Sequence, residues 1–262
     1  MIPPAGYLET TLRAARDRGR KLLVPYVTGG LGPRWVEVAE AMAAAGADAI
    51  EVGIPFSDPV MDGPTIQAAS QRALELGATP PTILDALPAA DVAVPLVALT
   101  YYNLVFRGGH RRFARALRDA NVSGAVVPDI PLEELQPWSR AADVEEIETV
   151  LLASPVTPDD RLARICALSR GFVYGVSVMG ITGERQTLAS SAGILAKRLK
   201  ACTDRPVLLG FGVSTPQQAV EACAEADGVI VASALMRRLL DGQSPDQVGD
   251  AVADLRAALD AG

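Results

Sequence analysis

Short apolar runs alternate along the chain with longer stretches in which apolar residues recur every three or four positions. The short runs do not alternate apolar with polar residues, which is typical of parallel strands buried on both faces. The sequence therefore predicts eight strands, over residues 22–27, 49–53, 95–101, 124–128, 149–153, 172–177, 206–210 and 228–232.

Helical periodicity fills the gaps between these strands, and further helices lie before the first strand and after the last. Eight strand–helix units in 262 residues predict an α/β fold, a single (β/α)8 TIM barrel domain over residues 1–262. We expect an extra N-terminal helix over 8–18 and a short extra helix over 233–240 after the eighth strand. The other predicted helices cover 33–45, 65–76, 111–121, 133–142, 158–168, 189–201, 216–224 and 245–259.

The rival architecture is a doubly wound open sheet. Dinucleotide-binding sheets of that kind carry a G-x-G-x-x-G fingerprint after the first strand, whereas residues 28–33 read TGGLGP. In a barrel, the active site lies at the carboxyl ends of the strands. The Gly- and Pro-rich segments that follow the predicted strands are therefore where functional residues are expected.

Composition narrows the class of protein. Apolar residues make up 49% of the chain, and the net charge of −7 argues against a nucleic-acid-binding surface. No apolar run is long enough to span a membrane and no apolar signal region opens the chain, so we expect a soluble, cytoplasmic protein with no membrane partner. Cys166, Cys202 and Cys223 are widely spaced and are expected to be reduced thiols.

Glu51 is an acidic residue in the middle of the second predicted strand, with no Lys or Arg within ten positions on either side. It shares a strand face with Ala49 and Gly53, while large aliphatic residues occupy the other face and suit packing against helices. Glu51 is therefore predicted to point into the barrel, where lost hydration raises a carboxyl pKa and suits general acid–base chemistry. The alternative is a structural Glu that hydrogen-bonds to hydroxyl groups in the barrel.

A second acidic cluster follows in the loop after this strand. Asp62 lies beyond Pro55 and Pro59, and Gly63 and Pro64 end the loop before the next predicted helix. Asp62 either folds back over the barrel mouth or remains a solvated loop residue. Asp58 is expected to be a turn residue or a partner contact.

Glycine-rich turns follow the last predicted strands. Barrels often bind phosphate with the loops after strands seven and eight and with the N-terminus of a short extra helix. Gly212 follows the seventh strand here, and Ala232 and Ser233 follow the eighth. The loop after the sixth strand adds Gly183. These turns either cradle a phosphate or simply need glycine to be tight.

Few other side chains are available for chemistry. Of the three lysines, Lys21 precedes the first strand and Lys197 and Lys200 lie on a late helix, so none is expected to reach the barrel mouth to form a Schiff base. The only histidine, His110, is expected at a helix start, and one histidine does not build a typical metal site. Proton transfer by carboxylates and tyrosines remains, and Tyr174 on the sixth strand is either part of it or an aromatic filler of the barrel.

Several motifs together resemble the tryptophan synthase alpha subunit family, and the resemblance extends over essentially the whole chain. The longest is EVGIPFSDPVMDGPTIQ at 51–67, and the others are VPYVTGG at 24–30, YYNLV at 101–105, PDIPLEE at 128–134, GFVY at 171–174, MGITG at 179–183 and GFGVS at 210–214. The resemblance implies a barrel that cleaves indole-3-glycerol phosphate to indole and glyceraldehyde 3-phosphate. It implies no cofactor on this chain and no metal.

The resemblance also implies roles for individual residues. Glu51 matches the general acid–base, Asp62 the carboxylate that accepts the indole N–H, and Tyr174 the tyrosine beside the catalytic Glu. Phosphate contacts match Gly183, Gly212 and Ser233, next to Ala232, and Thr182 lies in a mobile loop. An α2β2 complex with a pyridoxal-phosphate-carrying beta subunit is implied, which meets this chain at Pro55, Asp58, Pro59, Asn103, Asp129 and Pro131.

One departure concerns Ala232, because many members of the family have Gly there. If the position requires a positive φ, Ala costs about 1 kcal/mol or more, but we expect phosphate still to bind. Three other functions stay open at this point: a stand-alone lyase that releases free indole, a non-catalytic barrel that activates beta, and a glycoside hydrolase with paired carboxylates.

Overall fold

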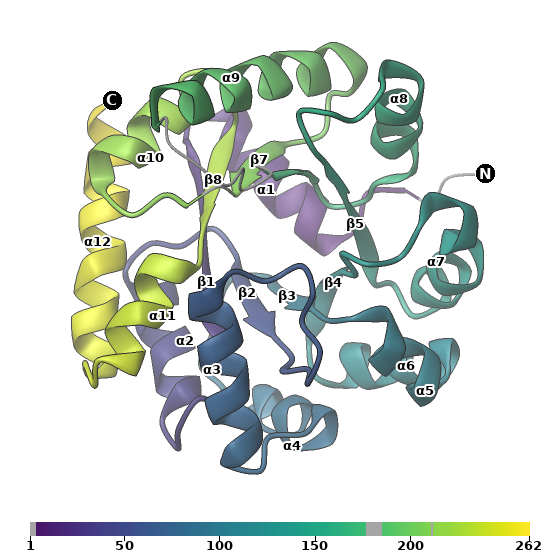
Figure 1. Cartoon of the computed structure of the whole chain (residues 1–262), viewed down its shortest axis with the longest axis vertical. Helices are drawn as coiled ribbons and strands as arrows, with labels where there is room; N and C mark the ends of the chain where they lie inside the picture. Colours follow the sequence, from purple (N-terminus) through teal and green to yellow (C-terminus); the bar gives the residue numbers. More distant parts are fainter. Residues whose placement is uncertain (1–3, 177–184, 211) are drawn as a thin grey trace.

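The computed structural model, which describes residues 4–176, 185–210 and 212–262, contains a closed barrel of eight parallel strands in sequence order (Figure 1). Each strand pairs with the next, and β8 pairs with β1. The predicted (β/α)8 fold is thereby confirmed. The strands are β1 (Leu22–Thr28), β2 (Ile50–Gly53), β3 (Leu96–Leu99), β4 (Val122–Val126), β5 (Glu148–Ala153), β6 (Val173–Val176), β7 (Val207–Gly210) and β8 (Gly228–Val231).

Helices surround the barrel, as Figure 1 shows. The extra N-terminal helix α1 (Tyr7–Asp17) and the short helix after β8, α11 (Ser233–Leu240), are both present as predicted. The others are α2 (Trp35–Ala44), α3 (Pro64–Glu75), α4 (Pro80–Leu84), α5 (Tyr102–Gly108), α6 (His110–Asp119), α7 (Leu135–Val144), α8 (Asp159–Leu168), α9 (Arg185–Cys202), α10 (Pro216–Ala222) and α12 (Pro245–Ala261), with 3-10 turns η1 (Leu87–Ala89) and η2 (Leu132–Glu134). None of the helices so described is long and apolar enough to cross a membrane.

The strand side chains form two separate apolar layers. Ile50 and Val52 pack outward in the layer shared with the helices, whereas Ala49 belongs to the cluster that fills the barrel interior. This is the alternation expected for a strand covered on both faces. Glu51 consequently points inward, as the sequence predicted, and is 1% exposed.

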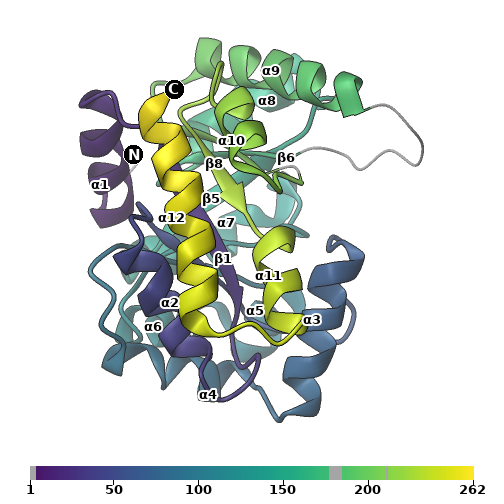
Figure 2. The same ribbon diagram turned by 90° about the vertical axis from the view of Figure 1, so that its left-hand side faces the viewer.

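Helix α1 closes the N-terminal end of the barrel and lies at the left of Figure 2, away from α3 and α11. Leu8 inserts so closely that a Cβ on Gly124 or Gly171 would lie 2.6 Å from its Cδ2 atom. The carboxylate of Glu148 accepts hydrogen bonds from the backbone N–H groups of Gly6 and Glu9, each at 3.1 Å. These bonds satisfy donors that a helix start leaves unpaired.

The sequence did not predict α4, η1 and α5. Thr79 caps helix α4 with a hydroxyl that accepts from the N–H of Thr82, but the two prolines that follow Thr79 are typical of a loop. Helix α5 begins where the N–H of Tyr102 donates to Oδ1 of Asp129 at 2.8 Å. That acceptor is 27 residues away in the chain, so local sequence pattern does not contain it.

Replacement of Leu8 by Ala tests the closing role of α1. We expect the free energy of unfolding to fall by about 3 kcal/mol, because the substitution leaves a cavity between α1 and the barrel. Urea unfolding measures the change. Tyr7→Ala, in the same helix but at a side chain that is 58% exposed, is the matched control, and an equal effect of the two substitutions would contradict the assignment.

Candidate active site

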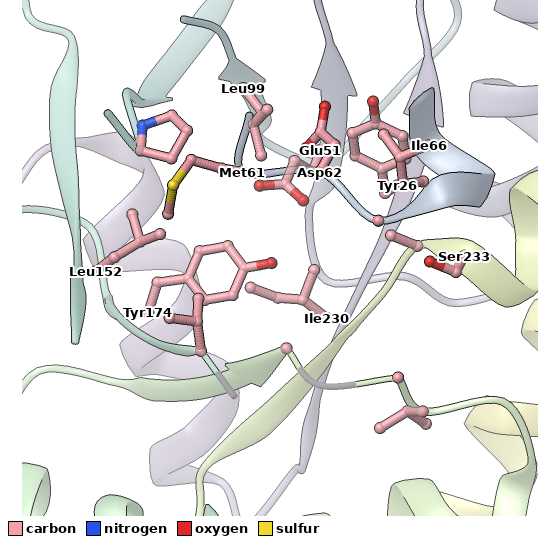
Figure 3. Close-up of a pocket in the computed structure, with 17 residues that line it drawn as sticks. Tyr26, Glu51, Met61, Asp62, Ile66, Leu99, Leu152, Tyr174, Ile230 and Ser233 are labelled. Atoms are coloured by element: carbon pink, nitrogen blue, oxygen red, sulfur yellow. The ribbon is translucent and has the colours of Figure 1, made fainter. Parts of the chain in front are cut away.

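A cavity of 230 Å³ opens at the carboxyl ends of the strands (Figure 3). It is the place where the barrel fold predicts a site. Its lining combines two carboxylates, two tyrosines, apolar side chains and glycine turns. The lining residues are Tyr26, Glu51, Met61, Asp62, Gly63, Ile66, Leu99, Pro128, Leu152, Tyr174, Val176, Gly210, Gly212, Val213, Ile230, Ala232 and Ser233.

Glu51 is the buried acid of this cavity. Its Oε1 atom is inaccessible and has no hydrogen-bond partner within the part of the chain that the structure describes. Burial, and to a lesser extent the charge of Asp62, raises the pKa of Glu51 to about 8. Glu51 is thus a protonated acid at neutral pH that becomes a base once it has given its proton away.

Asp62 reaches the same cavity from the loop before α3, so it is folded back over the barrel mouth rather than free in solvent. Burial raises the pKa of Asp62 to about 6, and a hydrogen bond from Tyr101 partly opposes the increase. The two carboxyls are therefore in different states near pH 7, with Glu51 protonated and Asp62 ionised. Unequal ionisation of neighbouring carboxyls is a common basis for dividing acid and base roles.

Tyr101 holds the loop that carries Asp62, a role that the sequence did not predict. Its ring stacks on Phe56 at a centroid distance of 5.2 Å, and its hydroxyl accepts a hydrogen bond from the N–H of Met61 at 3.0 Å. Tyr101 thus contacts the loop near both ends. The signal available in the sequence was an aromatic side chain with a polar hydroxyl at the last residue of the predicted strand 95–101.

Tyr26 and Tyr174 each occupy space left by a glycine. A Cβ on Gly53 would lie 1.8 Å from the Tyr26 hydroxyl oxygen, and a Cβ on Gly210 would lie 2.5 Å from the Tyr174 ring. Burial and the nearby carboxylates raise both tyrosine pKa values well above the ordinary range, so both hydroxyls stay protonated. Tyr174 was a predicted site residue, whereas Tyr26, whose hydroxyl accepts from Thr28 at 3.3 Å, was not.

The turns after β7 and β8 form another part of the wall. Gly212 has φ +57, a conformation that favours glycine, and a side chain there would meet open space. Ala232 has φ −116, so the strain that would follow from a positive φ does not arise. Ser233 is the first residue of α11, where backbone N–H groups are available to an anion. Thr182 and Gly183 lie outside the described residues.

The residues expected at a partner surface differ in exposure. Asp58, Asn103 and Pro131 are exposed and Pro59 is half-buried. Two further members of the set, Pro55 and Asp129, are buried and half-buried respectively. Asp129 has a role within the chain, since it accepts the hydrogen bond that begins α5.

The three lysines lie away from the cavity, as expected from the sequence. Lys21 donates to the carbonyl oxygens of Cys223 and Ala226, and Lys197 and Lys200 pair with carboxylates at 3.1 and 2.7 Å. His110 begins α6, and its Nε2 atom lies 3.0 Å from the Tyr102 hydroxyl. Within the described ranges, no group of three or more His, Cys, Asp or Glu side chains is arranged to hold a metal ion.

The arrangement suits a ligand with three chemically distinct parts. Leu99, Leu152, Val176 and Ile230 offer apolar surface to a flat ring, and Asp62 is an acceptor for an N–H group on it. The start of α11 offers donors to an anion. Glu51 can exchange a proton with an atom between these two regions.

Comparison with known proteins relates this geometry to one family. The model of the tryptophan synthase alpha chain family matches residues 12–260. The tryptophan synthase alpha chain of Thermobifida fusca is 41% identical over 261 residues, which cover 97% of each chain.

Solved structures show similarity to the same family. A chain of Mycobacterium tuberculosis tryptophan synthase superposes with a TM-score of 0.88 at 36% identity, over 97% of this chain and 98% of that one. The tryptophan synthase alpha subunit of Legionella pneumophila superposes with a TM-score of 0.89 at 29% identity, over 98% and 99% of the two chains. Both similarities extend over nearly the full length of the barrel.

Glu51→Gln tests the burial of this carboxyl through stability. Between pH 4.5 and pH 8 the folded protein keeps a proton on Glu51 that the unfolded chain has released, so wild-type stability falls as pH rises through this interval. Glutamine removes that dependence. We expect the stability of the variant relative to wild type to increase by on the order of 3 kcal/mol from pH 4.5 to pH 8.

Urea unfolding at several pH values measures this difference. Asp58→Asn, in the exposed part of the following loop, gives the baseline for removing a carboxylate charge. A stability difference between Glu51→Gln and wild type that stays constant with pH would show that Glu51 is not held as a neutral acid.

Proposed function

The chain belongs to the tryptophan synthase alpha chain family, and we propose that Glu51 and Asp62 carry out the reaction of that family in the barrel cavity. The family cleaves indole-3-glycerol phosphate to indole and glyceraldehyde 3-phosphate in tryptophan biosynthesis, so the chain is a carbon–carbon lyase. The observation that carries the assignment of roles is the buried carboxyl of Glu51, whose Oε1 has no hydrogen-bond partner among the described residues, beside a second carboxyl in one cavity.

The reaction begins with proton donation. The bond between indole C3 and the first glycerol carbon does not break while the ring is neutral, because an indolyl anion is a poor leaving group. Protonated Glu51 gives its proton to C3, and the ring becomes an indolenine cation with the charge centred on its nitrogen. A pKa of about 8 keeps Glu51 protonated for this step at neutral pH.

Asp62 stabilises the cation. Its ionised carboxylate accepts the ring N–H and places a negative charge where positive charge develops, and such electrostatic stabilisation is often the largest contribution to catalysis. Tyr101 and the loop contacts around Met61 fix its position before the substrate arrives. Asp62 requires the ionised form, which a pKa of about 6 provides at neutral pH.

Cleavage then returns the proton. Glu51, now a carboxylate, takes the proton of the hydroxyl on the first glycerol carbon, that carbon becomes the aldehyde of glyceraldehyde 3-phosphate, and the bonding electrons return to the ring. Indole leaves neutral and Glu51 is protonated again, so protons balance over one turnover. Tyr174 stays protonated and can donate a hydrogen bond to the Glu51 carboxylate in this interval.

The phosphate of the substrate is assigned to the turns after β7 and β8. Gly212 lines the cavity in the turn after β7, and Ala232 and Ser233 line it at the start of α11. The partial positive charge of a helix N-terminus and its free N–H groups favour a phosphate there. Gly183 is assigned to the same site on the family resemblance, and Thr182 to the loop that covers it.

A partner completes the biological role. The matched Mycobacterium tuberculosis structures are of tryptophan synthase, and we propose an α2β2 complex in which a beta subunit receives the indole and carries pyridoxal phosphate. The exposed residues Asp58, Asn103 and Pro131 are the assigned contact points, with Pro55, Pro59 and Asp129 supporting the same loops. Such a complex is expected in the cytoplasm.

Release of indole from indole-3-glycerol phosphate by the purified chain tests the proposed function. We expect slow release that increases sharply when a beta subunit is added, and loss of release in Glu51→Gln, because a carboxamide is too weakly acidic to transfer a proton. Circular dichroism and beta binding control for the fold of the variant. Substantial turnover by Glu51→Gln would refute its role, and rapid release that beta does not change would indicate a stand-alone lyase.

The pH dependence of kcat/KM tests the two protonation states. We expect a bell, rising near pH 6 as Asp62 loses its proton and falling near pH 8 as Glu51 loses its own. The substrate phosphate also titrates at about pH 6, so Asp62→Asn is the control that separates the two ionisations. An unchanged low-pH limb in that variant would assign the limb to the phosphate, and constant activity from pH 6 to pH 9 would contradict both assignments.

A further inference from the structure

Helices α3 and α11 begin at opposite ends of the cavity and pack against each other. Helix α11 begins at Ser233, in the turn assigned to phosphate, and α3 begins at Pro64, two residues after Asp62. The two helices lie side by side in both Figure 1 and Figure 2 and pack against each other. A contact between the first turn of α3 and Arg237, in the last turn of α11, therefore relates the position of Asp62 to the helix whose start is assigned to phosphate.

The start of α3 has no side-chain cap. Its N-cap residue is Gly63 and Pro64 has no N–H, while Nε2 of Gln67 in the same helix donates to the carbonyl oxygen of Asp62 at 2.8 Å. Thr65 is the first residue of this helix with a polar side chain, and it is buried. Its hydroxyl accepts a hydrogen bond from Nη2 of Arg237 at 2.9 Å.

The arginine extends from a well-anchored helix. Leu235 and Met236 are buried against the barrel, and Sδ of Met236 accepts from the backbone N–H of Thr28 at the end of β1, at 3.3 Å. Arg237 is the next residue. The following residue, Arg238, points elsewhere and donates to Oε1 of Gln243 at 3.1 Å.

We propose that Arg237 is a positioning residue that holds Asp62 in register with the phosphate-binding turn through its hydrogen bond to Thr65. The inference rests on the proposed function, because it concerns how one substrate is held at both ends. Phosphate bound at the start of α11 and the indole N–H bound by Asp62 belong to one molecule. A small displacement of α3 relative to α11 therefore moves the acceptor away from the ring nitrogen.

This arrangement predicts an effect on turnover rather than on phosphate affinity. In Arg237→Met and Thr65→Val we expect kcat for indole-3-glycerol phosphate to fall about tenfold, because misplacing a catalytic group costs rate directly. The affinity for glycerol 3-phosphate, measured by calorimetry, should stay within about twofold of wild type. The double variant should lose no more than either single variant, because both remove the same bond.

Arg238→Met is the matched control, since it removes a neighbouring guanidinium of the same helix that contacts Gln243, and it should keep wild-type kcat. Circular dichroism controls for folding of each variant. Wild-type kcat in Arg237→Met, or losses that multiply in the double variant, would overturn the inference. So would weaker glycerol 3-phosphate binding in Arg237→Met but not in Thr65→Val, because Arg237 would then contact the phosphate itself.

These outcomes are distinct from failure of the proposed function. If the wild-type chain released no indole, with or without beta, both the proposed function and this inference would be refuted. If wild type and Arg237→Met were equally active, only the inference would be refuted.

Discussion

A carboxyl group buried in an apolar barrel, with no cationic side chain among the described residues that line its cavity, is the constraint on which the rest of this structure depends. Glu51 loses hydration, and Asp62 in the same cavity further disfavours its charge. The barrel tolerates this burial because Glu51 is uncharged in the folded protein near pH 7. The nearby tyrosines add no charge, and α1 closes the opposite end of the barrel. The burial that makes Glu51 costly in its ionised form is also what gives it a proton to donate at neutral pH.

The two carboxyls are supported in different ways, and this difference fits their roles. Glu51 is part of a strand paired on both sides, so its backbone position is fixed by the barrel. Asp62 lies on a loop and depends on contacts from other elements: Tyr101 from the end of β3 and Arg237 through Thr65 at the start of α3. A proton donor thus belongs to the rigid wall, and the group that recognises the ring nitrogen belongs to a segment that other elements hold in place.

Much of the fold and part of the site could be predicted from the sequence, because both follow from local patterns. The eight strands, the inward direction of Glu51 and the turns at Gly212 and Ser233 depend on periodicity and on glycine placement. Tyr101, Tyr26 and the start of α5 could not be predicted, because each acts through a residue distant in the chain or in a neighbouring strand. The possible strain at Ala232 depended on a backbone angle that only the structure gives, and φ −116 removes it.

The closing of the barrel by α1 has a consequence for how the chain folds as it is made. Leu8 leaves the ribosome early, but Gly124 and Gly171, against which it packs, and Glu148, which accepts hydrogen bonds from the start of the helix, are all synthesised much later. The N-terminal helix therefore remains an undocked amphipathic segment through more than half of translation. Its docking is a contact of long sequence separation, the kind that forms late and slows folding, so sealing of the barrel floor belongs to the last stages of folding.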